Sequence, residues 1–168
     1  MLPISKLAVA RVFTSWTKAL KKKIFESSPC AAMSQKIDPT LPFGSFLKLV
    51  DDLPKQHLAI IFQLCTGHVP LNKHLHRISK VDSPKCPHCP NTTKTILHYL
   101  LECPKYADAR HRLRRALHQK ARSLPSLLAD PKCTKPTLAF IHATNCFKTT
   151  HGDLSPPPEK EKQNPTLA

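Results

Sequence analysis

Apolar residues recur three or four positions apart along much of this chain, which is the spacing of amphipathic helices. The pattern is clear from residue 5 to residue 25, where the apolar positions are Val9, Val12, Trp16, Leu20 and Ile24 and lysines fall between them. We predict that an amphipathic helix forms the first unit of the chain, over residues 1–26.

The next apolar stripes are short and are separated by breaks. Ser, Pro, Met and Gln interrupt the periodicity over residues 27–42, which predicts a linker. A short helix is expected around Ser45 to Val50, and a longer one from Pro54 to Gly67, because proline favours the first helical turn and glycine the end. The apolar stripe of the longer helix would be Leu58, Ile61, Phe62 and Cys65.

Helical periodicity also dominates the second half of the chain. A single helical turn is expected at Asn72 to Ile78, and a long stripe runs from Tyr106 to Leu124 with one or two closing helices after it. We find no strand-like alternation of any length. The fold class is therefore predicted as all-α: a small helical domain over residues 43–150 with one metal-binding hairpin at residues 86–103. The tail at 151–168 is rich in proline and charge, so it is predicted to be disordered.

The composition adds a strong charge bias. The 168 residues contain 26 Lys and Arg against 11 Asp and Glu, which gives a formal net charge of +15. Such a balance favours a polyanionic partner, either nucleic acid or an anionic membrane surface. No apolar run reaches the length of a membrane span, so no membrane partner is expected.

The cysteines bear on the cellular compartment. Seven cysteines without a hydrophobic signal segment favour metal binding or free thiols over an extracellular disulfide framework. We expect a nuclear or cytoplasmic protein. Mitochondrial targeting is the minor alternative, because the first 25 residues are basic and contain no acid.

The segment CPHCPNTTKTILHYLLEC, residues 86–103, carries a metal-ligand spacing of C-x2-C-x8-H-x4-C. Cys86 and Cys89 are spaced so that a tight turn points both sulfurs at one ion, and Pro84, Pro87 and Pro90 favour that turn. Three thiolates and one imidazole are typical of a structural zinc site. The sequence thus predicts one zinc ion held by Cys86, Cys89, His98 and Cys103.

The second ligand pair poses a geometric problem. His98 and Cys103 are five residues apart, which is about 140° around an ideal α-helix, so a straight helix would not present both to one ion. Pro104 disfavours the α conformation at Cys103, and we expect the helix to unwind there. His88, inside the turn, is the main rival to His98 as the fourth ligand.

Basic residues flank this segment on both sides. Arg110, Arg114 and His118 recur at four-residue steps and so share a helix face. Contacts to phosphate groups would suit such a belt, which predicts sequence-independent nucleic-acid binding. The candidate residues are Arg77, Lys80, Lys85, Arg110, Arg114, Arg115 and Arg122. Tyr99 and Tyr106 are interpreted as packing residues, with base stacking as the alternative.

Catalytic motifs are missing from the sequence. Three glycines cannot supply a phosphate-cradling loop, and no Ser-His-Asp or Cys-His arrangement has supporting context. A zinc ion with four protein ligands leaves no open position for substrate or water. We therefore expect that this chain is not an enzyme.

Several blocks, taken in order, resemble a known family. The blocks LPKQHLAIIFQLCTGHVPLNKHLHRI, SPKCPHC, HYLLECPKYADARHRLRRAL and SLPSLLADPK are similar to the C-terminal region of fungal non-LTR (LINE-type) retrotransposon polyproteins. There, a segment with a CCHC zinc-binding motif follows the reverse transcriptase and RNase H domains. The likeness is dense from about Asp38 to Phe147, roughly two thirds of the chain.

The resemblance implies that Cys86, Cys89, His98 and Cys103 form the CCHC motif. It also implies a role in handling element RNA or target DNA, without catalytic domains in this chain. Two alternatives stay open. One is a zinc-stapled packing module that docks on a parent reverse transcriptase and RNase H, and the other is a non-functional remnant.

Overall fold

The computed structural model describes residues 6–29, 31–39, 41, 49 and 53–156. This part of the chain is mostly helical, as predicted, and contains one small antiparallel sheet of two strands. The elements, in chain order, are α1 (Lys6–Glu26), α2 (Ala31–Ile37), α4 (Lys55–Thr66), α5 (Asn72–Arg77), β1 (Lys85–Cys86), β2 (Cys89–Thr93), the π-helix η1 (His98–Glu102), the 3-10 helix η2 (Pro104–Tyr106), α6 (Ala107–Leu117), the 3-10 helix η3 (His118–Arg122), α7 (Leu124–Ala129), α8 (Pro131–Thr144) and α9 (Lys148–His151).

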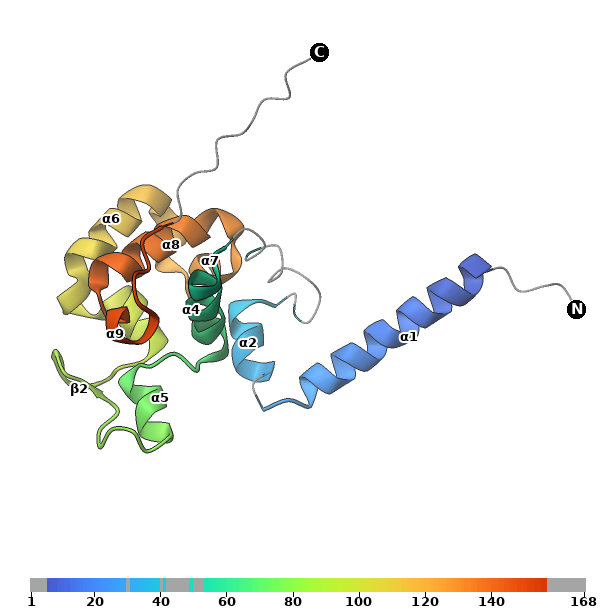
Figure 1. Ribbon diagram of the computed structural model, residues 1–168, viewed down its shortest axis with the longest axis horizontal. Helices are drawn as coiled ribbons and strands as arrows, with labels where there is room; N and C mark the ends of the chain where they lie inside the picture. Colours follow the sequence, from blue (N-terminus) through green and yellow to red (C-terminus); the bar gives the residue numbers. More distant parts are fainter. Residues whose placement is uncertain (1–5, 30, 40, 42–48, 50–52, 157–168) are drawn as a thin grey trace, which may run out of the picture.

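Helix α1 is the N-terminal helix predicted from periodicity, and Figure 1 shows it projecting away from the remaining elements. Its apolar stripe faces outward, since Val12 is 70% exposed and Trp16 is 60% exposed. The stripe therefore contributes little to the core. None of the described helices combines the length and apolar character needed to cross a membrane.

Helix α2 lies within residues 27–42, so the prediction of a linker there was wrong. Its sequence, AAMSQKI, is made mostly of good helix formers, and only the flanking prolines, Pro29 and Pro39, mark breaks. Ala31 and Ile37 are buried where α2 packs against α4 and α7. The helix expected around Ser45 to Val50 falls outside the described residues, apart from the buried Leu49.

Helix α4 has the predicted ends but a different buried face. It follows Pro54 and ends at Gly67, whose left-handed φ of 76° lets its amide bond to the carbonyl of Gln63. Leu58 and Phe62, assigned to the stripe, are exposed. The buried residues are His57, Ile60, Ile61 and Leu64. Apolar residues lie on both faces, so periodicity alone could not tell which face α2 and α7 would cover.

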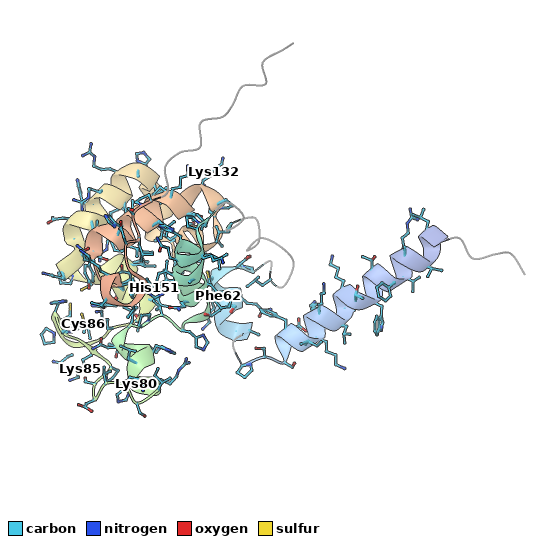
Figure 2. All side chains as sticks on the ribbon, viewed as in Figure 1. Phe62, Lys80, Lys85, Cys86, Lys132 and His151 are labelled. Atoms are coloured by element: carbon cyan, nitrogen blue, oxygen red, sulfur yellow. The ribbon has the colours of Figure 1, made fainter. Side chains whose placement is uncertain are left out.

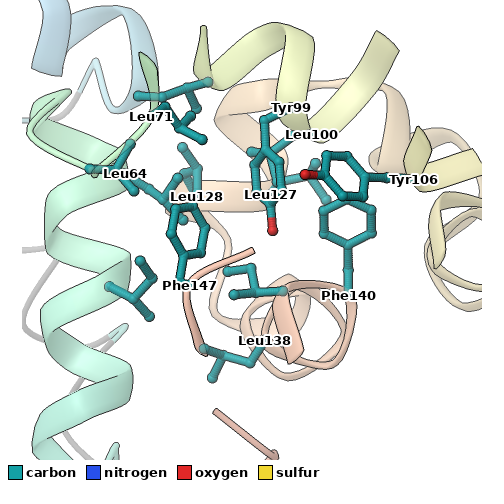
Figure 3. Packing of buried hydrophobic residues seen from close by; sticks show 14 of the residues in the cluster. Leu64, Leu71, Tyr99, Leu100, Tyr106, Leu127, Leu128, Leu138, Phe140 and Phe147 are labelled. Carbon is teal, nitrogen blue, oxygen red and sulfur yellow. The ribbon is translucent and has the colours of Figure 1, made fainter. Parts of the chain in front are cut away.

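The core is centred on the aromatic ring of Tyr99, which Figure 3 shows among leucines and other rings. Tyr99 makes edge contacts with Tyr106, Phe140 and Phe147 at centroid distances of 5.2, 5.5 and 5.2 Å. Its hydroxyl lies 2.7 Å from the Oγ1 of Thr144, so the buried polar group has a partner. Both tyrosines are packing residues.

The helix that carries the Tyr106 to Leu124 stripe is broken at His118. The residue has a φ of 49°, which ends α6 and starts η3. The stripe nonetheless turns inward, since Ala109, Leu113 and Ala121 are all buried. This part of the periodicity prediction is confirmed.

The segment after α9 is ordered further than predicted. The side chain of Gln56 donates to the carbonyl of Asp153 at 2.7 Å, and Leu154 is buried. Disorder from residue 151 onward is therefore wrong for residues 151–156, which pack back toward α4. The rest of the predicted tail, residues 157–168, lies outside the described residues.

The side chain of Asp130 caps the N-terminus of α8. Its Oδ1 accepts a bond from the amide of Lys132 at 2.9 Å, and its Oδ2 accepts one from Nζ of Lys120 at 2.6 Å. The hydrogen bond from Lys120 has the largest effect in lowering the pKa of the Asp130 carboxyl, followed by the hydrogen bond from the amide of Lys132. Because the folded pKa lies below the unfolded value of about 3.9, the stabilisation is present above that pH and is lost as pH falls through the folded pKa.

We expect Asp130→Ala to lower the free energy of unfolding by about 1 kcal/mol at neutral pH, because α8 loses its cap. The difference in the free energy of unfolding between this variant and the parent chain should become smaller below about pH 4. Urea unfolding followed by circular dichroism measures both. Asp82→Ala, at an exposed turn position, is the matched control, and an equal loss in both variants would contradict the capping role.

Candidate metal centre

Two cysteines of the site lie on a short hairpin. Strands β1 and β2 pair antiparallel with Cys86 opposite Cys89, so the intervening residues 87 and 88 form the tight turn. The amide of Lys94 donates to the carbonyl of Pro84 at 2.9 Å and closes the open end. The two strands are too short for alternation to show in the sequence, which explains why the hairpin was predicted without strands.

The other two candidate ligands are His98, the first residue of η1, and Cys103, which follows its last residue; the π-helical form of η1 resolves their five-residue spacing. The amide of Cys103 donates to the carbonyl of His98 at 2.7 Å, an i to i+5 bond that places the two residues one above the other. Cys103 then leaves the helix with a ψ of 119°, as expected before Pro104. The predicted unwinding is confirmed, while the wider turn before it was not foreseen.

The four predicted ligands come together. Their candidate ligand atoms all lie within 4.8 Å of one another, which is close enough to hold one metal ion. The Sγ atom of Cys103 is 3.9 Å from that of Cys86 and 3.7 Å from that of Cys89. These distances exclude disulfides, and the described cysteines are all free thiols.

His98 shows the strongest sign of a missing partner. It is 4% exposed, and neither ring nitrogen makes a hydrogen bond in the described part of the chain. A buried imidazole without partners is costly unless one nitrogen binds something else, such as a metal ion. The exposed carboxylate of Glu102 lies nearby, with its Oε2 at 3.5 Å from Nδ1.

The Cys89 thiol loses its proton less readily than a free thiol. Burial, followed by hydrogen bonds with Cys103 and Cys86, raises the pKa of Cys89 to about 11. Ligation of a metal to this sulfur at neutral pH therefore releases a proton.

Arg110, on the neighbouring helix α6, bonds to η1 and to Cys103 after it; these residues, 98–103, are called the π-turn below. Its Nε donates to the carbonyl of Leu100 at 2.9 Å, and its Nη2 donates to that of Cys103 at 2.8 Å. A longer bond of 3.5 Å reaches the carbonyl of Tyr99. The guanidinium thus satisfies carbonyls left open where the helix ends.

The predicted assignment of Arg110 to a nucleic-acid surface is therefore corrected: it is 5% exposed and faces the metal centre. The sequence contained a signal that was overlooked. Arg110 lies four residues after Tyr106 and three before Leu113, so it occupies a position in the buried apolar stripe.

The rival ligand and the remaining cysteines lie elsewhere. His88 is exposed at the turn and is not part of the cluster. Cys65 and Cys133 pack in the protein, and burial, with a smaller effect of Asp38, raises the pKa of Cys65 to about 12. Cys146 is half-buried, and Cys30 falls outside the described residues.

The other predicted basic residues are exposed. Figure 2 shows Lys80 and Lys85 at the same end of the molecule as Cys86. A second group lies at the end of α6, where Arg114, His118, Gln119 and Arg122 line a shallow cavity of about 250 Å³. The exposed members of the predicted set are Arg77, Lys80, Lys85, Arg114, Arg115 and Arg122.

Comparison with known proteins finds no counterpart: no family model, no curated protein and no solved structure matches the chain. The resemblance to retrotransposon polyproteins therefore stays a prediction.

We expect Arg110→Lys to loosen the metal centre, because one ammonium cannot reproduce the planar guanidinium that spans the carbonyls of Leu100 and Cys103. Affinity for Co²⁺, read from its thiolate absorption bands, should fall by about tenfold or more. The free energy of unfolding should fall by about 2 kcal/mol.

Arg114→Lys is the matched control, since Arg114 is on the same helix and exposed. Equal Co²⁺ affinity in the two variants would show that Arg110 does not position the ligands.

Proposed function

We propose that the chain binds one zinc ion through Cys86, Cys89, His98 and Cys103. The observation that supports this most directly is the set of sulfur distances. Thiolates on a tetrahedral zinc ion, at about 2.3 Å from the metal, lie about 3.8 Å from each other. The two measured distances, 3.7 and 3.9 Å, fit this value. Such a donor set is typical of structural zinc.

Zinc in this position would act as a structural staple. It would join the hairpin to the end of η1, and it would supply the partner that His98 lacks. Three thiolates leave the zinc site with a net charge of −1, and the guanidinium of Arg110 next to Cys103 would offset it. All four coordination positions are taken by protein, so the ion would not contact a substrate.

We expect Cys89→Ser to abolish stoichiometric zinc binding and to unfold the hairpin locally. Metal analysis should fall from about one zinc per chain to none. Hydrogen exchange should show reduced protection around the amide of Lys94, while protection of α8 remains. Cys65→Ser, away from the cluster, should keep its zinc. A hairpin that stays protected without zinc would contradict the staple.

We further propose that the zinc module binds nucleic acid through phosphate contacts. This rests on the net charge of +15 and on the exposed basic side chains that flank the metal centre on both sides. The cavity lined by Arg114 and Arg122 offers two guanidinium groups to one phosphate. Contacts of this kind position a protein on RNA or DNA without reading sequence. The resemblance to retrotransposon polyproteins supports element RNA or target DNA as the polyanion.

We expect affinity for oligonucleotides to fall steeply as salt rises, because bound phosphates release counterions. In Arg114→Ala/Arg122→Ala, the slope of log affinity against log salt should become shallower by about 0.9 for each phosphate of duplex DNA that the variant no longer neutralises. Fluorescence anisotropy with single- and double-stranded probes at several salt concentrations measures the slope.

The charge-matched control is Lys132→Ala/Lys148→Ala, on exposed positions of α8 and α9. If the slope of log affinity against log salt is the same in the two double variants, Arg114 and Arg122 do not contact the phosphates. One zinc per chain without any oligonucleotide binding would instead favour the packing module for a parent reverse transcriptase.

A further inference from the structure

A groove of about 770 Å³ lies beside the metal hairpin. Its walls come from the loop after α4, from α5 and from residues 93–97, which link β2 to η1; Leu124 of α7 also lines it. His98 follows this wall directly, so the groove and the metal centre share one backbone segment.

The apolar part of the groove is aliphatic. Val69, Leu71 and Ile96 are buried in its lining, whereas Leu97 is 45% exposed. Among the described residues that line the groove, none is Phe, Tyr or Trp. Apart from the imidazoles of His74 and His76, its described lining therefore offers no aromatic ring on which an unpaired base could stack.

The polar lining consists of threonines, histidines and cationic side chains, and none of the described lining residues is Asp or Glu. Nη2 of Arg77 lies 3.0 Å from Nδ1 of His74, which can accept a hydrogen bond there when neutral. Burial, with smaller effects of Arg77 and His68, lowers the pKa of His74 and agrees with that role. The charged lining residues are thus Lys73, Arg77 and Lys94.

Lys94 is the most informative of the three. It is only 8% exposed, and its side chain makes no hydrogen bond or ion pair within the described part of the chain. Its stem is buried, while its ammonium nitrogen is not among the side-chain atoms that are shut off from water without a partner. The ammonium therefore stays available to an anionic group placed in the groove, with which it would form a charge-assisted contact.

The groove is held open by contacts between α5 and the hairpin. The side chain of Asn72 donates to the carbonyl of Lys85 at 2.8 Å, and the amide of Lys73 donates to the carbonyl of Lys94 at 3.3 Å. The first bond joins α5 to β1, and the second joins it to the residue that follows β2. A ligand would therefore meet a preformed surface, with little ordering cost.

We propose that this groove docks a short segment of a partner protein in which acidic side chains stand beside aliphatic ones. The acidic groups would pair with Lys94, Lys73 and Arg77, and the aliphatic groups would pack on Ile96 and Leu97. A nucleic-acid strand fits less well, because it would leave the aliphatic lining without an apolar partner. This interaction is separate from the phosphate contacts assigned to Arg114 and Arg122.

The test is selection of a displayed library of short random peptides against the zinc-loaded full chain. We expect the enriched peptides to combine Asp or Glu with Leu, Ile or Val. A synthetic copy of the most enriched peptide, measured by fluorescence anisotropy, should bind Lys94→Met and Leu97→Ser about tenfold more weakly. Zinc content and circular dichroism confirm that both variants fold.

Lys132→Met and Leu58→Ser, exposed positions outside the groove, provide the matched controls and should bind the peptide like the parent chain. Arg114→Ala/Arg122→Ala should lose oligonucleotide affinity and keep peptide affinity, which separates this proposal from the nucleic-acid one. Enriched peptides without acidic residues, or equal binding by Lys94→Met and Lys132→Met, would overturn the proposal. So would a loss of oligonucleotide binding in Leu97→Ser, because the groove would then belong to nucleic acid.

Discussion

One backbone hydrogen bond, from the amide of Cys103 to the carbonyl of His98, closes the π-turn that brings these two residues to the two cysteines of the hairpin. An α-helical turn would place these residues on different faces and leave the cysteines of the hairpin with an incomplete ligand set. Two neighbours make the wider turn stable. Pro104 disfavours helical backbone at Cys103, and Arg110 bonds the carbonyls that the widened turn leaves without helical partners. The chemistry of the site thus rests on backbone geometry as much as on the ligands themselves.

The same turn connects the metal centre to the core and to the surface groove. Tyr99, the second residue of η1, is at the centre of the aromatic cluster, and Leu100 beside it is fully buried. On the other side, Ile96 and Leu97 line the groove next to α5. If the cluster binds a metal ion, its loss should therefore affect both the packing around Tyr99 and the groove lined by Ile96 and Leu97. A small core with few aromatic residues gains most from such a staple, because it has limited apolar area to bury.

Burial divides the arginines into two roles. Arg110 exchanges water for carbonyl oxygens and stabilises the fold, while Arg114 and Arg122 remain exposed around a shallow cavity. Arg110 and Arg114 lie four residues apart on α6, and Arg122 lies on η3, which follows it. Arg110 packs against the π-turn, whereas Arg114 and Arg122 are exposed to solvent. The net charge of the chain counts the buried Arg110 together with the exposed arginines, so it overstates the positive charge on the surface.

The sequence by itself determined the mostly helical class, the ends of α4 and the four Cys and His positions that lie close enough to hold a metal ion, because periodicity, proline, glycine and ligand spacing are local signals. It misplaced the buried face of α4, treated α2 as a linker and gave Arg110 to the surface. Only tertiary structure could decide these points. Two faces of α4 are apolar enough to be buried, and the choice depends on the packing of α2 and α7. The π-turn, likewise, depends on a guanidinium supplied from α6. The groove combines the end of α4, α5, the link after β2 and the start of α7, so no local pattern could indicate that their aliphatic and cationic side chains meet.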